Sequence, residues 1–237
     1  MQLSERLAVI ANMVTKGNRV VDVGCDHGYI PIWLVEQGVI PGAIAMDINK
    51  GPLFRAQSNI EQHGLSPYIE TRLSDGVAAL REGEGDTLVI AGMGGPLMER
   101  ILEDGAAVLM SIQEFILEPQ SEIGHMRLYL QKHGYEITDE DMVFEDGKFY
   151  PVIKVVHGSM EPLTDEELEY GPCLLKKQHP ILYRYMQYEL EGAQRLSHEL
   201  MKVQSTGAAR RMEEIRTKKE LIKSVLNYFE ANNAEID

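Results

Sequence analysis

The sequence contains few residues of the kinds that form disulfides, bind structural metals or cross a membrane. Among 237 residues there are two cysteines, Cys25 and Cys173, and the seven histidines form no H-x-x-x-H pair. This excludes a disulfide framework and a thiolate-rich zinc site. No apolar run approaches the roughly 18 residues that span a bilayer, and the polar start of the chain does not resemble a secretory signal. We therefore expect a cytoplasmic protein with no structural metal and no membrane contact.

Basic residues are scarce overall but unevenly distributed. The 23 Lys and Arg residues face 37 Asp and Glu residues, and the net charge of −14 argues against a protein that coats nucleic acid. Residues 1–158 carry 12 basic and 23 acidic groups, whereas residues 171–229 carry 11 basic and six acidic groups. A polyanionic partner therefore fits only the C-terminal part of the chain, where we expect weak, salt-sensitive binding.

Strand-like and helix-like segments alternate in the first 158 residues. Apolar residues recur at helical spacing behind Ser4, a candidate helix N-cap. Strands are expected at 19–24, 43–47, 68–73, 87–91, 115–117, 135–143 and 149–156, and further helices at 30–37, 52–63, 97–109 and 123–132. This alternation predicts an α/β fold with a mostly parallel sheet. Only residues 144–148 separate the last two strands, which predicts a hairpin and an antiparallel final strand.

The pattern changes after residue 158. Apolar residues spaced by three and four predict two long helices, at 180–203 and 208–230. The short connection at 204–207 predicts an antiparallel helical hairpin, and the spacing suits a two-stranded coiled coil. We therefore divide the chain into a sheet domain at 1–158 and a helical coiled-coil domain at 159–237.

The loop after the first strand is the most informative segment. It reads Val21-Asp22-Val23-Gly24-Cys25-Asp26-His27-Gly28-Tyr29. A glycine-rich turn between a strand and a helix lets a ligand approach the backbone closely. A dinucleotide fingerprint would need glycine where Asp26 and Tyr29 stand, and Asp26 would repel a pyrophosphate. Asp22 and Asp26 suit a cationic ligand such as S-adenosylmethionine, with its ammonium and sulfonium groups. The simpler alternative is a turn that only closes a strand–helix unit.

Polar residues or glycines also follow the next three strands. Asp47 is placed to accept hydrogen bonds from both ribose hydroxyls of a nucleotide. The segment Ser74-Asp75-Gly76 fits either a contact with an adenine amino group or a helix N-cap. The run Ala91-Gly92-Met93-Gly94-Gly95 predicts a flexible loop at the crevice of an open sheet. Because these features follow successive strands, they predict a single site at the carboxyl ends of the sheet.

Together the motifs resemble those of the bacterial tRNA (adenine(22)-N1)-methyltransferase family. The resemblance is carried by D-V-G-C-D-H-G at 22–28, D-I-N at 47–49, S-D-G at 74–76, A-G-M-G-G at 91–95, L-S-E-R-L at 3–7 and Y-G-P-C-L-L at 170–175. It implies a class I methyltransferase with a Rossmann-like sheet that uses S-adenosylmethionine, and a C-terminal coiled coil that helps to hold tRNA. The chain departs from the family pattern where Leu117-Glu118-Pro119-Gln120 replaces an expected Gln-Pro-Asn, so the roles of Glu118 and Gln120 stay open.

The resemblance implies methyl transfer from S-adenosylmethionine to N1 of adenine 22 in tRNA. An unpaired adenine has a free lone pair on N1, so the reaction depends on positioning and on stabilising the positive charge that develops on a flipped-out base. Asp26 would accept from the adenine amino group, Tyr29 would stack on the ring, and His27 would pack against the cofactor or shuttle a proton. Alternatively, His27 and Tyr29 only shape the cofactor pocket. The candidate cofactor-binding residues are Asp22, Gly24, Cys25, Asp26, His27, Gly28, Asp47, Ile48, Asp75, Gly76, Ala91, Gly92, Met93 and Gly94.

Basic residues of the helical hairpin are candidates for contacting RNA phosphates. They are Lys176, Lys177, Arg184, Arg195, Lys202, Arg210, Arg211, Arg216, Lys218, Lys219 and Lys223. The alternative is a solvated hairpin with ordinary ion pairs, such as Arg216 with Glu220. Two other functions stay open: a methyltransferase of this fold acting on another RNA, a small molecule or a protein, and a non-catalytic RNA-binding protein. We expect tRNA as the partner, no obligate protein partner, and a monomer, with a dimer through the coiled coil left open.

Overall fold

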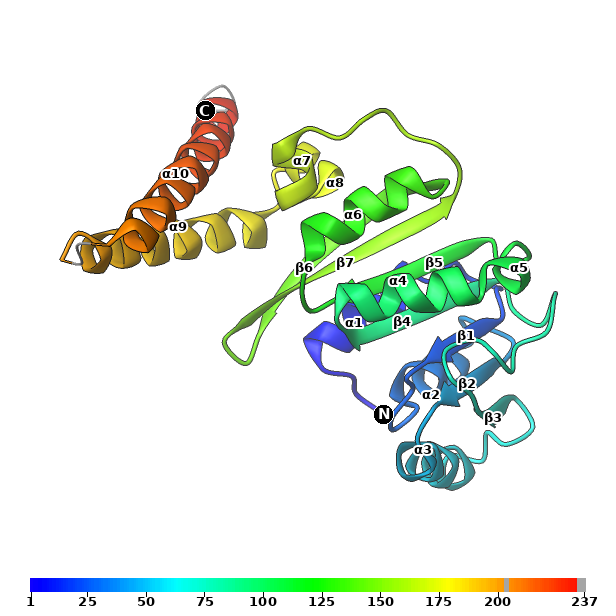
Figure 1. Cartoon of the computed structure of the whole chain (residues 1–237). Helices are drawn as coiled ribbons and strands as arrows, with labels where there is room; N and C mark the ends of the chain where they lie inside the picture. The colour runs from blue at the N-terminus through cyan, green and yellow to red at the C-terminus, as the bar shows by residue number, and fades with distance from the viewer. Residues whose placement is uncertain (203–204, 234–237) are drawn as a thin grey trace.

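A seven-stranded sheet forms the centre of the molecule (Figure 1). The computed structural model describes residues 1–202 and 205–233. The strands lie in the order β3-β2-β1-β4-β5-β7-β6. Their bounds are β1 Val20–Val23, β2 Ala43–Asp47, β3 Ile69–Leu73, β4 Thr87–Met93, β5 Glu114–Pro119, β6 Tyr135–Glu145 and β7 Lys148–His157.

Helices cover both faces of the sheet. Their bounds are α1 Glu5–Met13, α2 Tyr29–Glu36, α3 Lys50–Gln62, α4 Gly95–Asp104, α5 Ala106–Leu109, α6 Ile123–Lys132, α7 Asp165–Tyr170, α8 Pro172–Lys176, α9 Pro180–Leu200 and α10 Thr206–Asn233. Ile32 of α2 and Ile60 of α3 are buried in the core on one face, together with residues of α1. Met98 of α4 and Met126 of α6 are buried in the core on the other face. The predicted α/β architecture is therefore confirmed.

The directions of the strands also agree with the prediction. β1 pairs in parallel with β2 and β4, β2 with β3, and β4 with β5. β7 runs antiparallel to both of its neighbours, β5 and β6. The turn between β6 and β7 is tighter than expected: only Asp146 and Gly147 form it, at φ 48° and 79°. Positive φ at both positions is what a two-residue hairpin turn of type I′ requires.

The glycine-rich run at 91–95 differs from the flexible loop that the sequence suggested. β4 continues to Met93, with a register shift between Ala91 and Met93, and α4 begins at Gly95. Backbone hydrogen bonds hold the run, because Gln120 N donates to Met93 O at 2.9 Å and Gly95 N donates to Ser121 O at 3.1 Å. The helix expected at 97–109 is divided into α4 and α5 at Gly105.

A buried ion pair joins the sheet to the helices that precede the hairpin. Arg127 of α6 and Glu140 of β6 are almost completely buried, and Arg127 Nε donates to Glu140 Oε1 at 2.9 Å. Arg127 Nη1 also donates to the carbonyls of Leu168 and Glu169 in α7. Glu140 Oε2 accepts from the N–H of Cys173 at the start of α8. The pair therefore satisfies backbone groups at two helix ends that would otherwise lack partners.

Helices α9 and α10 form a hairpin that packs against the tip of the sheet. Leu182 and Met186 of α9 share a core with Ile222 and Leu226 of α10 and with Met142 of β6. A two-domain boundary after residue 158 stays a prediction, because this core contains residues from both sides of it.

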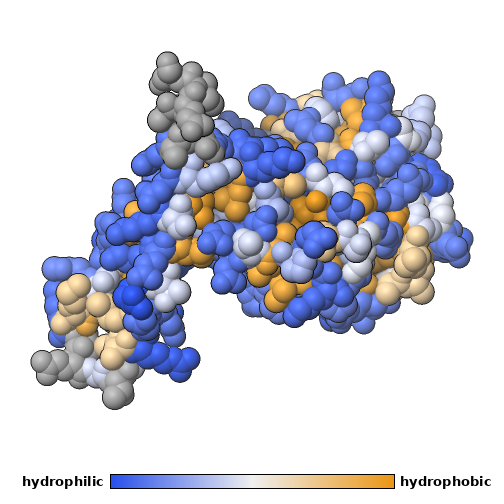
Figure 2. Space-filling view, turned by 90° about the horizontal axis from the view of Figure 1, so that it is seen from above, coloured by the Kyte–Doolittle hydropathy of each residue, from blue (hydrophilic) through white to orange (hydrophobic). Residues whose placement is uncertain are grey.

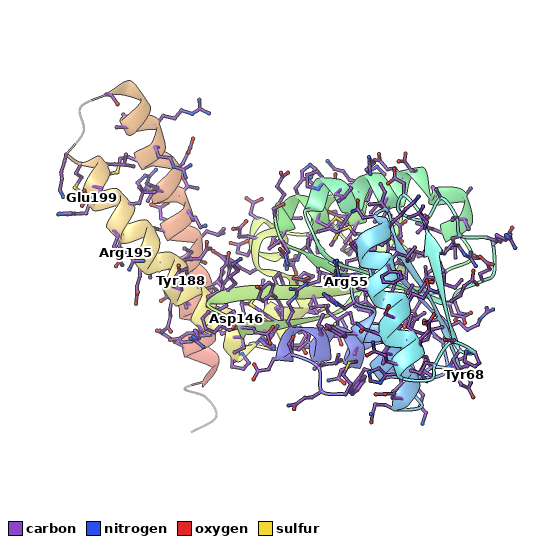
Figure 3. All side chains as sticks on the ribbon, turned by 90° about the horizontal axis from the view of Figure 1, so that it is seen from below. Arg55, Tyr68, Asp146, Tyr188, Arg195 and Glu199 are labelled. Carbon is purple, nitrogen blue, oxygen red and sulfur yellow. The ribbon has the colours of Figure 1, made fainter. Side chains whose placement is uncertain are left out.

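The hairpin extends away from the sheet and is largely hydrophilic on its surface (Figures 2 and 3). Tyr188, Arg195 and Glu199 follow one another along α9, with Tyr188 nearest the β6–β7 turn (Figure 3). α9 ends at Leu200, and α10 begins at Thr206, slightly before the expected start. The predicted end of the first helix and part of the predicted turn, at residues 203–204, lie outside the described residues. The coiled-coil geometry stays a prediction.

Candidate active site

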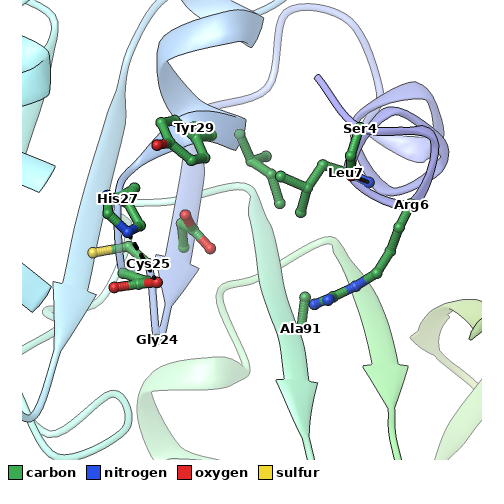
Figure 4. Close-up of a pocket in the computed structure, with 11 residues that line it drawn as sticks. Ser4, Arg6, Leu7, Gly24, Cys25, His27, Tyr29 and Ala91 are labelled. Carbon is green, nitrogen blue, oxygen red and sulfur yellow. Dashed lines mark hydrogen bonds and ion pairs between the residues drawn. The ribbon is translucent and has the colours of Figure 1, made fainter. Parts of the chain in front are cut away.

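A cavity of about 260 Å³ opens at the carboxyl ends of β1 and β4 (Figure 4). Open α/β sheets bind ligands where the strand order reverses, and it reverses between these two strands. The walls come from the loop after β1, from α2, from the end of β4 and from α1. The lining residues are Ser4, Arg6, Leu7, Asp22, Gly24, Cys25, Asp26, His27, Tyr29, Ile30 and Ala91. The cavity thus brings together most of the site residues predicted in the first loop.

The loop after β1 turns sharply because three of its residues have positive φ. Gly24, Asp26 and Gly28 have φ values of 77°, 43° and 69°. Aspartate tolerates this region better than most residues, and glycine adopts it without strain. The N–H groups of Gly24 and Cys25 both donate to Met46 O, at 2.8 and 3.0 Å. The loop is therefore fixed to the end of β2, and the two glycines of the motif are required by its path.

Asp22 provides a buried carboxyl group in the wall of the cavity. Asp22 is only 4% exposed. Burial, together with the nearby Asp47 carboxylate, raises the pKa of the Asp22 carboxyl group to about 7. Within residues 1–202 and 205–233, no cationic side chain pairs with it. A buried carboxylate is stabilised by a cation that brings hydrogen bonds. The site therefore fits the α-ammonium group of S-adenosylmethionine.

Asp26 lies on the open side of the cavity, where α3 supports it. Its Oδ1 accepts from Arg55 Nη2 at 2.7 Å, and its Oδ2 lies 3.5 Å from His27 Nε2. The rings of His27 and Tyr29 stack with centroids 5.0 Å apart. Asn59 of α3 donates to the backbone carbonyl of His27 at 2.9 Å. The three residues predicted to contact the base therefore lie together, and α3 holds Asp26 and the backbone of His27.

Several predicted cofactor residues lie outside the wall of this cavity. Asp47 accepts from the N–H of Asn49 at 2.8 Å and is close enough to Asp22 to raise its pKa. Ile48 is largely exposed. Asp75 and Gly76 line a separate, smaller cavity, in which Arg100 donates to Asp75 at 3.1 Å. The cavity therefore includes the predicted methionine end of the site but not the residues assigned to the adenine end.

The remaining predicted glycines have packing roles beside the cavity. Gly28 packs against Ala56 of α3, where an added Cβ would lie 3.4 Å from the Ala56 Cβ. An added Cβ on Gly24 would lie 2.3 Å from Met93 Cε, so the side chain of Met93, at the end of β4, packs against the loop. Gly92 donates its N–H to Glu118, and Gly94 directly precedes α4. None of Gly28, Gly92, Met93 and Gly94 lines the cavity.

Other residues of the site were not predicted from the sequence. Ser4, Arg6 and Leu7 of the α1 segment line the cavity. The motif L-S-E-R-L had marked this segment as distinctive without indicating a role. Arg55 and Asn59 support the loop from α3, and their i,i+4 spacing is the only sequence signal of a shared face. For Glu118, the sequence signal of a special role is an acidic residue that directly follows the apolar residues of β5.

Three further features of the described residues concern a reactive thiol, a metal centre and a membrane-spanning helix. Burial raises the pKa of the Cys25 thiol well above its usual range, so it stays protonated at neutral pH. Within residues 1–202 and 205–233, no group of three His, Cys, Asp or Glu side chains is placed to hold a metal ion. In the same part of the chain, no helix is both long and apolar enough to cross a bilayer.

Most of the basic hairpin residues form ion pairs with acidic neighbours. These residues are Lys177, Arg195, Lys202, Arg210, Arg211, Arg216 and Lys218. Arg184 lies over the Phe144 ring, with Cζ 3.9 Å from the centroid. Lys176, Lys219 and Lys223 form no ion pair with a residue that the structure describes. The expected i,i+4 pairs are therefore present, and phosphate binding by these residues stays a prediction.

Two solved structures share this fold over nearly the whole chain. Streptococcus pneumoniae Sp1610, in complex with S-adenosyl-L-methionine, is 37% identical, and the match covers 95% of this chain and all of that one, with a TM-score of 0.85. M. capricolum TrmK, in complex with the natural cofactor product S-adenosyl-homocysteine, is 27% identical. That match covers 96% of this chain and 99% of the other, with a TM-score of 0.82.

Comparison of the sequence gives the same relationship. A model of the tRNA (adenine(22)-N(1))-methyltransferase family matches residues 20–224, which include both the sheet and most of the hairpin. The tRNA (adenine(22)-N(1))-methyltransferase of Bacillus subtilis (strain 168) is 32% identical over 234 residues, 96% of this chain and 98% of the relative. The chain therefore belongs to the tRNA (adenine(22)-N(1))-methyltransferase family, as its motifs predicted, and is an S-adenosylmethionine-dependent enzyme that methylates N1 of an adenine in tRNA.

Proposed function

We propose that the cavity between β1 and β4 binds S-adenosylmethionine, with Asp22 paired to its α-ammonium group. The observation that carries this assignment is the buried carboxyl of Asp22, whose pKa is raised to about 7 by burial and by Asp47. A ligand ammonium group would compensate the charge that burial penalises. The sharp turn at Gly24 and Gly28 leaves the backbone of the loop accessible to the same ligand.

The other cofactor contacts follow from the order of the strands. β2 and β3 succeed β1 in the sheet, so the residues after them extend the site away from Asp22. Asp47 would accept hydrogen bonds from the ribose hydroxyls. Ile48, whose apolar side chain is exposed, would pack on the adenine ring, and Asp75 with Gly76 would approach the edge of that ring. Gly92, Met93 and Gly94 would border the methionine end from β4.

Asp26, His27 and Tyr29 would receive the target adenine. When bound, S-adenosylmethionine supplies an electrophilic methyl group. The N1 lone pair needs no base to activate it, so the residues act by position and charge. Asp26 would accept from the exocyclic amino group and stabilise the positive charge of the methylated ring. Tyr29, which is partly exposed and stacked on His27, would provide a surface on which the flipped base packs.

The helical hairpin, together with α8, would hold the phosphate backbone of tRNA. Lys176, Lys219 and Lys223 are the first candidates, because the described structure shows no carboxylate partner for them. The paired cations, such as Arg210 and Arg211, remain on exposed helix surfaces where a phosphate competes with Glu214. Such contacts release counterions and weaken as salt concentration rises.

Methyl transfer to a tRNA transcript by the purified full-length enzyme tests this function. We expect 1-methyladenosine at position 22, mapped by nuclease digestion and mass spectrometry, and no product on a transcript with guanine at that position. A methyl group at another atom or another nucleotide would contradict the assignment of the target. Calorimetry with Asp22→Asn tests the cofactor site, because unchanged affinity for S-adenosylmethionine would remove Asp22 from it.

A further inference from the structure

Arg6 and Glu118 form an ion pair beside the cavity that the roles above do not explain. Arg6 Nη2 lies 3.2 Å from Glu118 Oε2, and the same oxygen accepts from the N–H of Gly92 at 2.7 Å. Glu118 is completely buried, whereas Arg6 lines the cavity. The amide of Gln120 lies close by, because an added Cβ on Gly92 would be 3.8 Å from its Nε2. One carboxylate therefore ties α1 to the ends of β4 and β5.

The Arg6 side chain lines the cavity while two neighbours hold its guanidinium group. Its Cζ lies over the Tyr150 ring, 5.0 Å from the centroid, so that ring covers one side. Glu118 occupies one edge. The end of the side chain lies next to Ala91 in the cavity wall, while Tyr29 comes from the opposite wall (Figure 4). Aromatic rings and guanidinium planes are the two kinds of surface on which proteins stack unpaired bases.

Glu118 is unusual because its carboxyl group is fully buried and incompletely hydrogen-bonded, and this burial raises its pKa although Arg6 and the Gly92 N–H oppose the shift. Its Oε1 and the Nε of Arg6 are buried without a hydrogen-bond partner among the described residues. Such groups lower stability, so their presence here calls for a functional explanation. A purpose is available here, because N1 methylation places a positive charge on adenine and a lone guanidinium nearby would oppose it. The Glu118 carboxylate compensates that guanidinium at 3.2 Å.

We propose that Arg6 contacts the target base, stacking on it opposite Tyr29, and that Glu118 is a positioning residue that holds Arg6 in place and neutralises its charge. This inference rests on the proposed function, because it requires an adenine to enter the cavity beside the cofactor. It gives the L-S-E-R-L segment a role in substrate recognition. It also gives a role to Glu118, which with Gln120 marks the segment where the chain departs from the family pattern.

Steady-state kinetics with Arg6→Gln and Arg6→Lys test the contact. We expect Arg6→Gln to lower kcat/KM for a tRNA transcript by about tenfold or more, the usual effect of losing one base-stacking group. Its affinity for S-adenosylmethionine, measured by calorimetry, should stay within about twofold, because Arg6 pairs with Glu118 and not with Asp22, the proposed partner of the cofactor ammonium group. Arg6→Lys keeps the charge but not the planar surface and should resemble Arg6→Gln. Arg19→Gln, which breaks an ion pair with Asp86 at the opposite ends of β1 and β4, should leave both quantities unchanged.

The variant Glu118→Gln tests whether Glu118 acts by positioning Arg6, separately from the contact between Arg6 and the base. Glutamine retains an oxygen for the Gly92 N–H but leaves Arg6 uncompensated, so we expect kcat to fall while KM for tRNA stays near the wild-type value. Adding Arg6→Gln should recover part of this loss in kcat, since it removes the uncompensated charge. An Arg6→Gln enzyme with wild-type kcat/KM, or one that loses affinity for the cofactor in parallel, would overturn the inference. Absence of 1-methyladenosine with the wild-type enzyme would instead refute the proposed function itself.

Discussion

Arg55 donates to the Asp26 carboxylate at 2.7 Å across the open side of the cavity, from a helix 29 residues further along the chain. Both side chains are about half exposed, so the ion pair contributes under about 1 kcal/mol to stability. Its main effect is to orient Asp26, which itself adopts a positive φ. Asn59 holds the next residue of the same loop from the same helix. The orientation of the proposed base-binding loop therefore depends on α3.

Asp26→Asn should strongly lower the single-turnover rate of methyl transfer while the protein stays folded. Asparagine tolerates the positive φ of this position, but it lacks the charge that would stabilise the methylated ring. We expect a loss of about a hundredfold in single-turnover rate with tRNA. Asp146→Asn is the matched control, since Asp146 also has positive φ but lies in the β6–β7 turn. A near-normal rate for Asp26→Asn would remove Asp26 from the reaction.

The affinity for S-adenosylmethionine should pass through a maximum near pH 7 to 8. The pKa of Asp22 is about 7 in the free protein, so the carboxyl must lose a proton before it pairs with an ammonium group, and affinity at pH 6 should be about tenfold below its maximum. Above about pH 8 an α-amino group itself deprotonates, and affinity falls again. Calorimetry in buffers of different ionisation enthalpy should show proton release on binding near neutral pH.

Asp22→Asn should remove the rising limb of that profile and change stability in a defined direction. In the free wild-type protein the folded pKa lies above the ordinary value of 3.8, so ionisation of Asp22 opposes folding and stability falls as pH rises from about 4 to about 7. Asparagine cannot ionise, and the variant should lack this decrease in denaturant titrations. A rising limb that persists in Asp22→Asn would assign it to another group.

Gly24→Ala should weaken cofactor binding more than the general strain of a positive φ explains. An added Cβ would lie 2.3 Å from Met93 Cε, which must then move from its place beside the cavity. Gly38→Ala is the control, because Gly38 also has positive φ and an added Cβ there meets nothing within 4 Å. Both variants should lose about 1–2 kcal/mol of stability from backbone strain. Equal affinities of the two variants in calorimetry would argue against a close approach of the cofactor to Gly24.

Arg127→Met should destabilise the fold by about 3–5 kcal/mol in denaturant titrations, because it leaves the Glu140 carboxylate buried without its partner. The carbonyls of Leu168 and Glu169 would lose their donor as well. Arg100→Met, which removes an exposed pair with Asp75, should change the unfolding midpoint little. Similar midpoints for the two variants would show that the buried pair contributes little to joining the sheet and α7.

The double variant Lys219→Gln, Lys223→Gln should bind tRNA less tightly without a change in cofactor affinity. Loss of two phosphate contacts should reduce the slope of log Kd against log salt concentration by roughly 1.5–2. The double variant Lys16→Gln, Lys132→Gln removes the same charge from the sheet-bearing part of the chain and serves as the control. An equal loss in both variants would indicate a general charge effect, and no loss in either would argue against the hairpin contact.

The parts of the site that follow from local sequence were predictable. Gly24 and Gly28 mark the turn after β1, and Asp47 ends β2, because strand ends and positive φ leave direct traces in residue type. The antiparallel final strand was predictable from the short connection before it. The connection predicted at 144–148 contains the turn at Asp146 and Gly147 but is too long, because strand ends are poorly determined by composition alone.

Contacts between segments that are distant in the chain could not be predicted from residue type in this way. Arg55 and Asp26 meet only because α3 packs beside the loop, and Arg6 meets Glu118 only because α1 lies over the ends of β4 and β5. The end of β4 was placed too early because glycine usually ends a strand, whereas here a register shift carries the strand on to Met93. In each case tertiary packing decided the outcome.

The outer strand β6 has a consequence for the behaviour of the protein at high concentration. It forms one edge of the sheet, carries Asp139 and Asp141, and has a register shift between Ile137 and Asp139. Lys177, just beyond α8, binds Asp139 from outside the sheet. Charges, irregular pairing and a covering segment are the devices that prevent an edge strand from recruiting another chain. We therefore expect β6 not to pair with strands of other copies of the enzyme at high protein concentration.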